Sequence, residues 1–376
     1  MAGTGPHAAF GPPMQLGFVV PDLEAAVRHD SLWKIRWTLF RRSFMANWRL
    51  FKQNKVGLAG LAIIAMWGIL ALMPTIFFAT GYWTNSVYNP VTGLERNPPT
   101  VTVTLVVEKT DPLTEIDFRD MLLDQRIPQD LQVGDTFDRP LQPAPPDSRH
   151  WLGTDPLGRD IMSQIMHGAR AAFGLGFIAA TVTVVIATMV GSISAYFGGA
   201  LDSFFMRLAD LFIMIPALAV LIVLGAIIRF ELWHLALVIG LLGGFGGTAI
   251  VLKSQALAVK VKPFIDAARV AGGSHSHIIF SHLVPNVMPL SFLYMMFTVT
   301  AAIQSEATLS FLGLLNVKTS WGLMINLANT EGYLLQGGTY WWLVFPAGLA
   351  VTLLAAAFFL VGRAMDEVIN PRLRRR

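Results

Sequence analysis

Long apolar runs separated by polar stretches dominate the hydrophobic pattern of this chain. Six runs stand out, at about 56–78, 171–197, 209–229, 232–252, 287–309 and 341–362. Each run is near or above the roughly 20 residues that a helix needs to cross a bilayer. A bilayer core offers no partner for free backbone N–H and C=O groups, so each run is predicted to form a spanning helix. The predicted fold is therefore all-α and polytopic, with six transmembrane helices.

Basic residues gather in three of the polar stretches: before the first run, between the fourth and the fifth, and after the last. With six spans, all three stretches lie on the same side of the membrane, and the positive-inside rule makes that side the cytoplasm. We therefore predict a cytoplasmic N-terminal segment (1–55), a cytoplasmic loop (253–286) within a five-helix core (169–362), and a basic cytoplasmic tail (363–376). Both termini are then cytoplasmic.

Two polar stretches carry patterns of their own. Residues 79–168, which follow the first span at 56–78, are acidic, rich in proline and predicted to be extracytoplasmic. Within them, TVTVTLVVE at 100–108 alternates with the period of a half-buried strand, which predicts a small β-containing insert; a mostly irregular loop is the alternative. Residues 30–55 mix Trp, Phe and Leu with Arg and Lys, which is typical of an interfacial amphipathic helix, with an ordinary soluble helix as the alternative.

The composition agrees with this picture. Hydrophobic residues make up 54% of the 376 and charged residues only 14%, whereas soluble domains carry about 25% charged residues. The net charge of +4 follows from the basic cytoplasmic stretches, so no nucleic-acid partner is expected. The chain has no cysteine, which excludes disulfides and thiol chemistry. No secretory signal is apparent, so the first run is expected to be retained.

A polar segment interrupts the apolar second half of the chain. It reads PFIDAARVAGGSHSHIIFSHLVPN, at 263–286. Pro263 can begin a helix, and the Gly272–Gly273 pair supplies a turn. Ser274 is a plausible N-cap for a second helix, which Pro285 is expected to close. The segment is therefore predicted to form a helix–glycine–helix element that lies in a groove of a partner protein.

This segment resembles the "EAA" loop of the permease subunits of bacterial ABC importers. Asp266, Ala267, Ala268, Gly272 and Pro285 fall on the pattern, with Asp266 in place of the usual glutamate. Three further stretches resemble the oligopeptide, dipeptide and nickel branch, in its second-permease type. They are HWLGTDPLGRDIMSQIMHGAR (150–170), EATLSFLGLL with SWGLMI (306–325), and NPRLR (370–374).

The resemblance implies a type I ABC importer permease fold in a bacterial or archaeal cytoplasmic membrane. It implies a second homologous permease, two ATPase subunits that use ATP and Mg, and an extracytoplasmic solute-binding protein as partners. Coupling to the ATPases falls to Asp266, Ala267, Ala268, Arg269, Gly272 and Pro285. Peptides are the implied substrates; nickel chelates and oligosaccharides, which the same branch carries, are alternatives.

The stretch 150–170 is also expected to form an amphipathic helix at the outer surface. Asp155 and Pro156 suit the N-cap and the first helical position. Leu157, Ile161 and Ile165 recur at the spacing of one helix face. Gly158, Arg159 and Asp160 belong to this predicted outer helix together with Asp155. A direct role in gating and simple packing at the start of the next span are both open.

Catalytic motifs are missing from the sequence. It has no G-x-x-x-x-G-K-[ST], no H-E-x-x-H and no G-x-S-x-G, so no P-loop hydrolysis, zinc-protease site or nucleophile elbow is expected. His275, His277 and His282 lie close in sequence but lack carboxylate or thiolate companions, so no metal site and no bound cofactor are expected. The chain is therefore predicted not to be an enzyme.

Two residues in the spans are candidates for the pathway or its gate. Glu306 is a carboxylate near the outer end of the fifth run. It either takes part in transport, caps the end of the helix or extends to the membrane surface. Pro216 should bend the third helix, either to shape a gate or to fit the bundle. A stand-alone secondary carrier or channel, and a membrane scaffold that docks a non-ATPase partner, are the remaining alternatives.

Overall fold

The computed structural model describes residues 41, 45, 48–93, 100–110, 114–118, 121, 128–140 and 142–369. The chain divides into two units, 1–50 and 51–376, and the second holds nearly all described residues. The predicted interfacial helix at 30–55 falls mostly outside the described residues.

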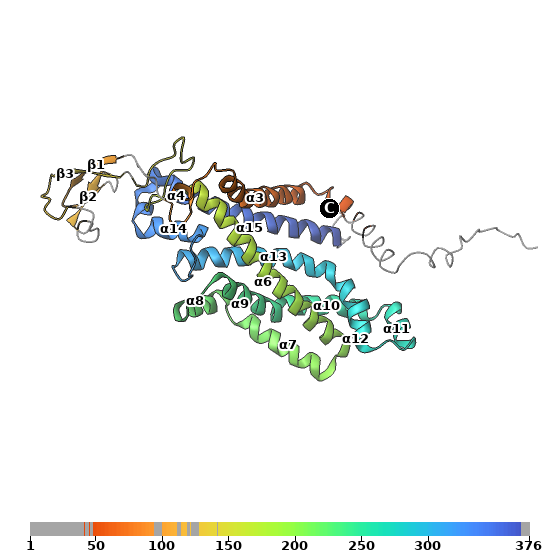
Figure 1. The fold of residues 1–376 in the computed structure, drawn as a ribbon. Helices are drawn as coiled ribbons and strands as arrows, with labels where there is room; N and C mark the ends of the chain where they lie inside the picture. Colours follow the sequence, from red (N-terminus) through yellow and green to blue (C-terminus); the bar gives the residue numbers. More distant parts are fainter. Residues whose placement is uncertain are drawn as a thin grey trace, which may run out of the picture. The chain divides into compact units, whose positions relative to one another are not determined.

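Four long helices correspond to four of the apolar runs, and each is long and apolar enough to cross a membrane. They are α3 (Lys55–Ala79), α6 (Ile161–Phe197), α13 (Val284–Phe311) and α15 (Trp341–Ile369). α3 packs on α15, α15 on α13, and α6 contacts all three (Figure 1). The helical prediction for these runs is confirmed, although α6 begins at Ile161, about two turns before the predicted start of the core at residue 169.

The other two apolar runs form bent pairs of helices. α7 (Gly199–Met214) and α8 (Ala217–Ile227) meet at 73°, and α9 (Leu232–Phe245) and α10 (Gly247–Lys260) meet at 43°. Pro216 produces a bend as predicted, but it lies at the break as the N-cap of α8 rather than inside a helix. Counted by length and composition, the described residues hold four spans, or six if each bent pair is one span.

Small residues let α6 approach its neighbours closely. Ala169, Ala179 and Ala187 on this helix are fully buried. A Cβ added to Gly191 would lie 2.7 Å from the Lys253 backbone nitrogen on α10. Close backbone approach through small residues is the usual way in which helices associate in membranes, where hydrophobic burial gives little driving force. α6 is thus the helix around which α9, α10 and α13 are arranged.

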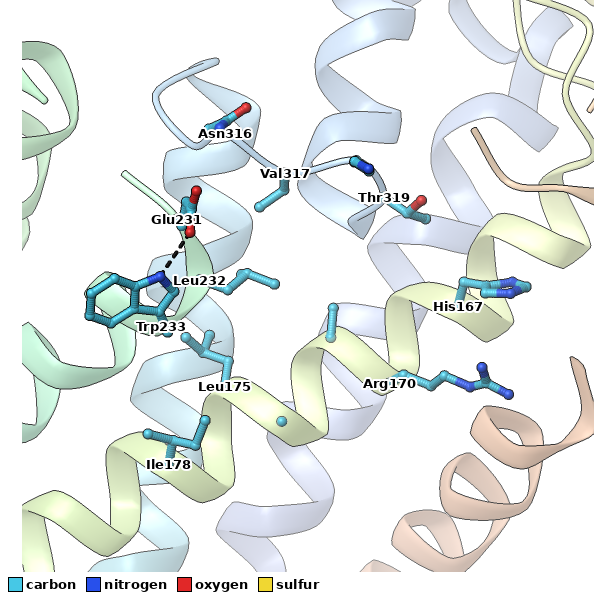
Figure 2. Close-up of a pocket in the computed structure, with 13 residues that line it drawn as sticks. His167, Arg170, Leu175, Ile178, Glu231, Leu232, Trp233, Asn316, Val317 and Thr319 are labelled. Carbon is cyan, nitrogen blue, oxygen red and sulfur yellow. Dashed lines mark hydrogen bonds between the residues drawn. The ribbon is translucent and has the colours of Figure 1, made fainter. Parts of the chain in front are cut away.

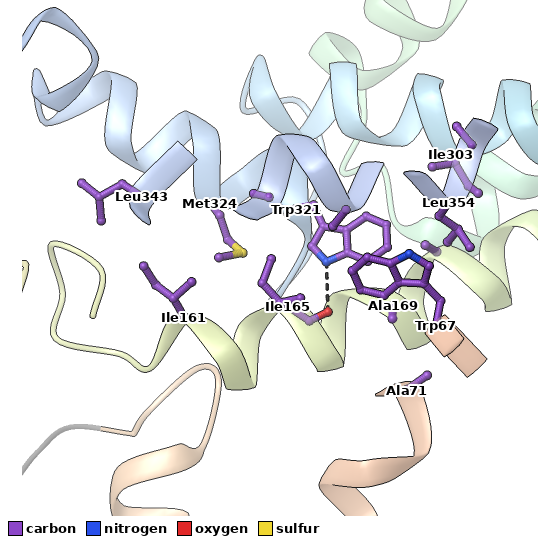
Figure 3. Close-up of a cluster of buried hydrophobic side chains, with 14 of the residues drawn as sticks. Trp67, Ala71, Ile161, Ile165, Ala169, Ile303, Trp321, Met324, Leu343 and Leu354 are labelled. Carbon is purple, nitrogen blue, oxygen red and sulfur yellow. Dashed lines mark hydrogen bonds between the residues drawn. The ribbon is translucent and has the colours of Figure 1, made fainter. Parts of the chain in front are cut away.

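The largest hydrophobic cluster centres on Trp321, the first residue of α14 (Trp321–Thr330). Its indole is 1% exposed, and Nε1 donates a hydrogen bond of 3.0 Å to the Ile165 carbonyl of α6. The Trp67 ring of α3 lies 5.1 Å away, centroid to centroid. Figure 3 shows both indoles between the helices. Gly168 is required here, because a Cβ would come within 2.6 Å of the Trp321 Nε1.

A small three-stranded sheet lies between α3 and α6 in the chain. β1 (Thr100–Leu105) pairs in parallel with β2 (Glu115–Ile116) and antiparallel with β3 (Thr136–Pro140), in the order β2-β1-β3. Val103, Leu105 and Ile116 are fully buried and form its own small core. The predicted β-containing insert is confirmed. A short helix, α4 (Asn85–Tyr88), precedes the sheet, and a 3-10 helix (Tyr333–Tyr340) connects α14 to α15.

Several predicted boundaries shift. α10 continues to Lys260, so the first part of the predicted loop 253–286 is helical. α15 continues to Ile369, so the predicted tail 363–376 begins as helix. Both helices continue past their apolar runs into charged residues, and the cytoplasmic limits at 253 and 363 stay predictions.

Candidate functional site

The helix–glycine–helix element forms as predicted in its first half. α11 (Pro263–Val270) begins at proline and ends in a Schellman motif. Gly272 has φ +79°, its N–H donates to the Arg269 carbonyl, and the Gly273 N–H donates to the Ala268 carbonyl. A side chain at Gly272 would therefore be strained even though nothing lies within 4 Å of an added Cβ. The glycine fixes the angle at which the chain leaves α11.

The second half of the element differs from the prediction. Ser274 is the N-cap of α12 (His275–Ile278), with its Oγ accepting from the His277 N–H, as predicted. Pro285, however, does not close the unit, because α12 runs through a π-helical turn (Ile279–Leu283) into α13. The Asn286 side chain donates to the His282 carbonyl at 2.7 Å. The wider turn and this bond let the helix continue through proline.

Contacts join the end of α10, α11 and α12 to the C-terminal end of α6. Lys260 Nζ donates to the Ala195 carbonyl at 2.8 Å, and the Tyr196 hydroxyl lies 2.8 Å from His275 Nδ1. The Arg269 guanidinium lies 5.6 Å from the centre of the Tyr196 ring, within the range of a cation–π contact. Ile265, 1% exposed, packs into the cluster that α6, α10 and α13 share. Displacement of α11 would therefore pull on α6.

The opposite side of α11 has no covering residues within the described chain. Asp266, Ala267 and Val270 lie opposite Ile265 on the helix, all three are exposed, and Val270 is 91% exposed. Asp266 and Arg269 form an exposed ion pair of 3.0 Å, which contributes little to stability. Of the predicted coupling residues, only Ala268 is half-buried on this helix. We call Asp266, Ala267 and Val270 the exposed α11 face.

At the other end of α6, the residues of the predicted outer helix form a turn instead. Asp155 Oδ1 accepts from the backbone N–H groups of Leu157 and Arg159, at 3.0 and 2.8 Å. Its Oδ2 accepts from Arg159 Nε at 2.7 Å and Gln164 Nε2 at 3.0 Å. Gly158 has φ +79°, which no α-helix contains. The prediction of Asp155 as an N-cap was wrong, because this carboxylate closes a turn before the helix starts.

Asp160 is the actual N-cap of α6. Its Oδ2 accepts from the Ser163 N–H at 2.6 Å, and its Oδ1 lies 2.8 Å from His150 Nδ1. Both Asp160 and His150 are 1% exposed. Ser163 is also buried, while Leu157 is 49% exposed, so the first turns of α6 are not the predicted surface amphipathic helix. The turn and its buried carboxylates hold the start of α6 in place.

A pocket of about 670 Å³ opens at this same end, away from α11. Its walls come from α6, from the start of α9 and from the segment 316–319 that follows α13 (Figure 2). Glu231, the N-cap of α9, accepts a 2.8 Å hydrogen bond from Trp233 Nε1. Arg170 of α6 also lines the pocket, and its guanidinium binds the Ala71 carbonyl and the Thr75 hydroxyl of α3.

Glu306 and Pro216, the predicted pathway residues, do not line this pocket. Glu306 is 3% exposed and accepts a 2.8 Å hydrogen bond from Ser310 Oγ, one turn further along α13. It is therefore enclosed by the chain rather than snorkelling to the surface. Its role in transport, and that of Pro216 in a gate, stay predictions.

Sequence reasoning missed several of the residues that the structure brings together. Tyr196 and Lys260 lie at the ends of apolar helices, where no local pattern marks Tyr196 as a partner of His275 or Lys260 as a partner of Ala195. Glu231 and Lys318 line the same pocket although they are 87 positions apart in the chain. The histidines were singled out, but His275 bonds to Tyr196, and His277 and His282 contact each other edge to face. No cluster of three or more potential metal ligands occurs in the described part of the chain.

Comparison with known proteins gives one consistent result. The sequence model of the family described as "Binding-protein-dependent transport system inner membrane component" matches residues 187–375, half of the chain. The dipeptide transport system permease protein of Bacillus subtilis is 32% identical over 237 residues, which cover 62% of this chain and 72% of that protein. The oligopeptide transport system permease protein of the same bacterium is 35% identical over 236 residues, 61% and 74% of the two chains. A probable D,D-dipeptide transport system permease protein of Escherichia coli is 30% identical over 230 residues, 61% and 75%.

Proposed function

The chain belongs to the binding-protein-dependent transport system inner membrane components, the permease subunits of ABC importers, and we infer from its coupling element that it forms half of an ATP-driven pathway for peptides. The observation that carries this proposal is the α11 element. Its helix α11 presents an exposed face on one side, and Arg269 of α11 and His275 of α12 contact Tyr196 at the C-terminal end of α6. Such an element can transmit the movement of a partner to the membrane helices.

In this proposal the exposed α11 face docks on an ATPase subunit in the cytoplasm. Ala267 and Val270 supply small and apolar surface, and Asp266 and Arg269 supply a rim of charge. When ATP draws two ATPase subunits together, α11 moves with its subunit. Tyr196, Lys260 and Ile265 pass that movement to α6, and the pathway switches between inward-facing and outward-facing states.

The remaining partners follow from the same proposal. The printed sequence contains no P-loop, so ATP and Mg are bound by separate ATPase subunits. A second, homologous permease supplies the other half of the pathway, and a solute-binding protein delivers the substrate from outside. Both termini and α11 lie in the cytoplasm of a bacterial or archaeal cell, as the basic stretches predict. The small sheet and the acidic insert around it are then extracytoplasmic, where they help to receive the binding protein.

Peptides are the proposed substrates because the relatives are named for dipeptide and oligopeptide transport. In the half of the pathway that this chain forms, Glu306 and Pro216 are the candidates for gating. The buried Glu306 carboxylate would influence gating through the packing around α13. The 73° break at Pro216 would let α7 and α8 move separately.

Purification of the tagged chain from its native membrane in mild detergent tests the assembly. We expect a second permease and ATPase subunits with Walker motifs to co-purify, and we expect membrane vesicles to take up peptides only with ATP. Nickel chelates and an oligosaccharide serve as comparison substrates in the same vesicles. A chain that purifies alone while its vesicles transport without ATP would contradict the proposal.

A further inference from the structure

The pocket at the far end from α11 holds an acidic and a basic side chain that form no ion pair with any residue the structure describes. Glu231 and Lys318 both line it, and both are exposed. Within the described part of the chain, neither residue forms an ion pair, and the Glu231 carboxylate is positioned by the Trp233 indole N–H. The second cation of the lining, Arg170, is already engaged with α3 through Ala71 and Thr75. Lys318 is thus the cation available to a ligand.

The floor of the pocket is apolar and unobstructed. Leu175 and Ile178 of α6 form part of it, beside Ala171 and Gly174. Nothing lies within 4 Å of a Cβ added to Gly174, so the glycine leaves a gap over the helix. Figure 2 shows Leu175 and Ile178 on one side of the pocket and Glu231 with Trp233 above them. A volume of about 670 Å³ is in the range of sites for small ligands.

The charged lining favours water or a polar ligand in this pocket over lipid tails. Two cations, a carboxylate and a histidine line the pocket, and charged groups are costly to hold against hydrocarbon. A ligand that satisfies both Glu231 and Lys318 carries one positive and one negative charge, and tolerates apolar surface between or beside them.

We propose that this pocket is a contact site for the termini of a short zwitterionic peptide on its way through the permease. The α-ammonium group binds Glu231 beside the Trp233 ring, which attracts cations. The α-carboxylate binds Lys318, and the variable side chains lie over Ala171, Gly174 and Leu175. Because only the terminal charges are recognised, the site accepts many sequences of similar length. The inference rests on the proposed peptide transport and adds a subsite to it.

The test fills the pocket without straining the helix. In Gly174→Leu, the new side chain occupies the open space, and leucine favours a helix more than glycine does. Gly348→Leu on α15 is the matched control, since an added Cβ there also meets open space. The probe is a zwitterionic tripeptide with a benzophenone side chain, photo-cross-linked to the complete purified transporter and mapped by mass spectrometry. Uptake of trialanine is measured on the same preparations.

We expect cross-links on the pocket segments in the unmodified complex and in Gly348→Leu, and about a tenfold loss of both cross-linking and trialanine uptake in Gly174→Leu, equivalent to about 1.4 kcal/mol. Glu231→Gln should weaken cross-linking by a similar factor, while Glu331→Gln, outside the pocket, should leave it unchanged.

If the unmodified complex takes up trialanine but cross-links only outside the pocket segments, the proposed contact site is wrong and the proposed peptide transport stands. Loss of the second permease from Gly174→Leu would identify the pocket as a subunit interface and overturn the inference. If the unmodified complex neither transports nor cross-links peptides, both proposals fail.

Discussion

Replacing Gly272 with valine is expected to stop ATP-driven transport while the chain still inserts and assembles. The residue has φ +79°, and β-branched side chains are strongly disfavoured there, at about 1–2 kcal/mol or more. That strain is small against the roughly 5–15 kcal/mol that stabilises a folded domain. It is relieved most easily by turning α11 relative to α12. The exposed α11 face is then turned away from the ATPase subunit on which it docks. Peptide uptake should therefore fall by more than about tenfold.

Two comparison variants separate the coupling role from strain alone. Gly332→Val places the same side chain at φ +80° with open space around it, in the segment between α14 and α15. It should lower thermal stability by a similar amount and keep most uptake. Gly272→Asn should keep uptake, since asparagine tolerates this conformation. Equal loss of uptake in Gly272→Val and Gly332→Val would show that strain, rather than the orientation of α11, limits transport.

Replacing Trp321 with alanine is expected to cause the largest loss of stability of any single side-chain truncation in the chain's main cluster. The indole is 1% exposed, contacts Trp67 at 5.1 Å and bonds to Ile165. Truncation of a buried tryptophan removes these contacts and leaves a cavity, at about 3–5 kcal/mol. In detergent, the thermal unfolding temperature of the purified complex should fall clearly, and the variant should be recovered in lower yield.

Trp321→Phe and Trp151→Ala are the controls for this prediction. Trp321→Phe keeps an aromatic ring but loses the hydrogen bond to the Ile165 carbonyl, so about 1 kcal/mol of the effect should remain from that bond. Trp151 is 57% exposed, and its truncation should change stability by only about 0.5 kcal/mol. A Trp321→Ala complex as stable as Trp151→Ala would contradict the proposed contribution of the buried Trp321 indole to stability.

The elements that sequence reasoning predicted well depend on local or periodic signals. Apolar runs of bilayer length gave the spans, because their helical state follows from the need to satisfy the backbone. The Thr–Val alternation predicted β1, and the short polar side chain of Ser274 predicted its capping bond. Gly272 was predicted as a turn, and its positive φ agrees. Each of these features is determined within a few residues of sequence.

The errors came from residues whose role depends on distant partners or on competition between neighbours. Asp155 and Asp160 are equally good N-caps locally, and the buried contacts with Gln164 and His150 decide between them. Pro285 usually ends a helix, yet a π-helical turn allows the helix to pass through it. The contacts of Tyr196 with His275 and of Lys260 with the Ala195 carbonyl join separate helices, so no local pattern could reveal them.

The central claim is that the exposed α11 face docks on an ATPase, and site-specific cross-linking tests it most directly. The sequence has no cysteine, so a single introduced cysteine is the only thiol on the chain. We would place it at Val270, 91% exposed on α11, and for comparison at Leu335, 90% exposed beyond α14. The account predicts that Val270→Cys cross-links to a Walker-motif subunit of the native complex and that Leu335→Cys does not. A cross-link to that subunit from Leu335→Cys, with none from Val270→Cys, would contradict it.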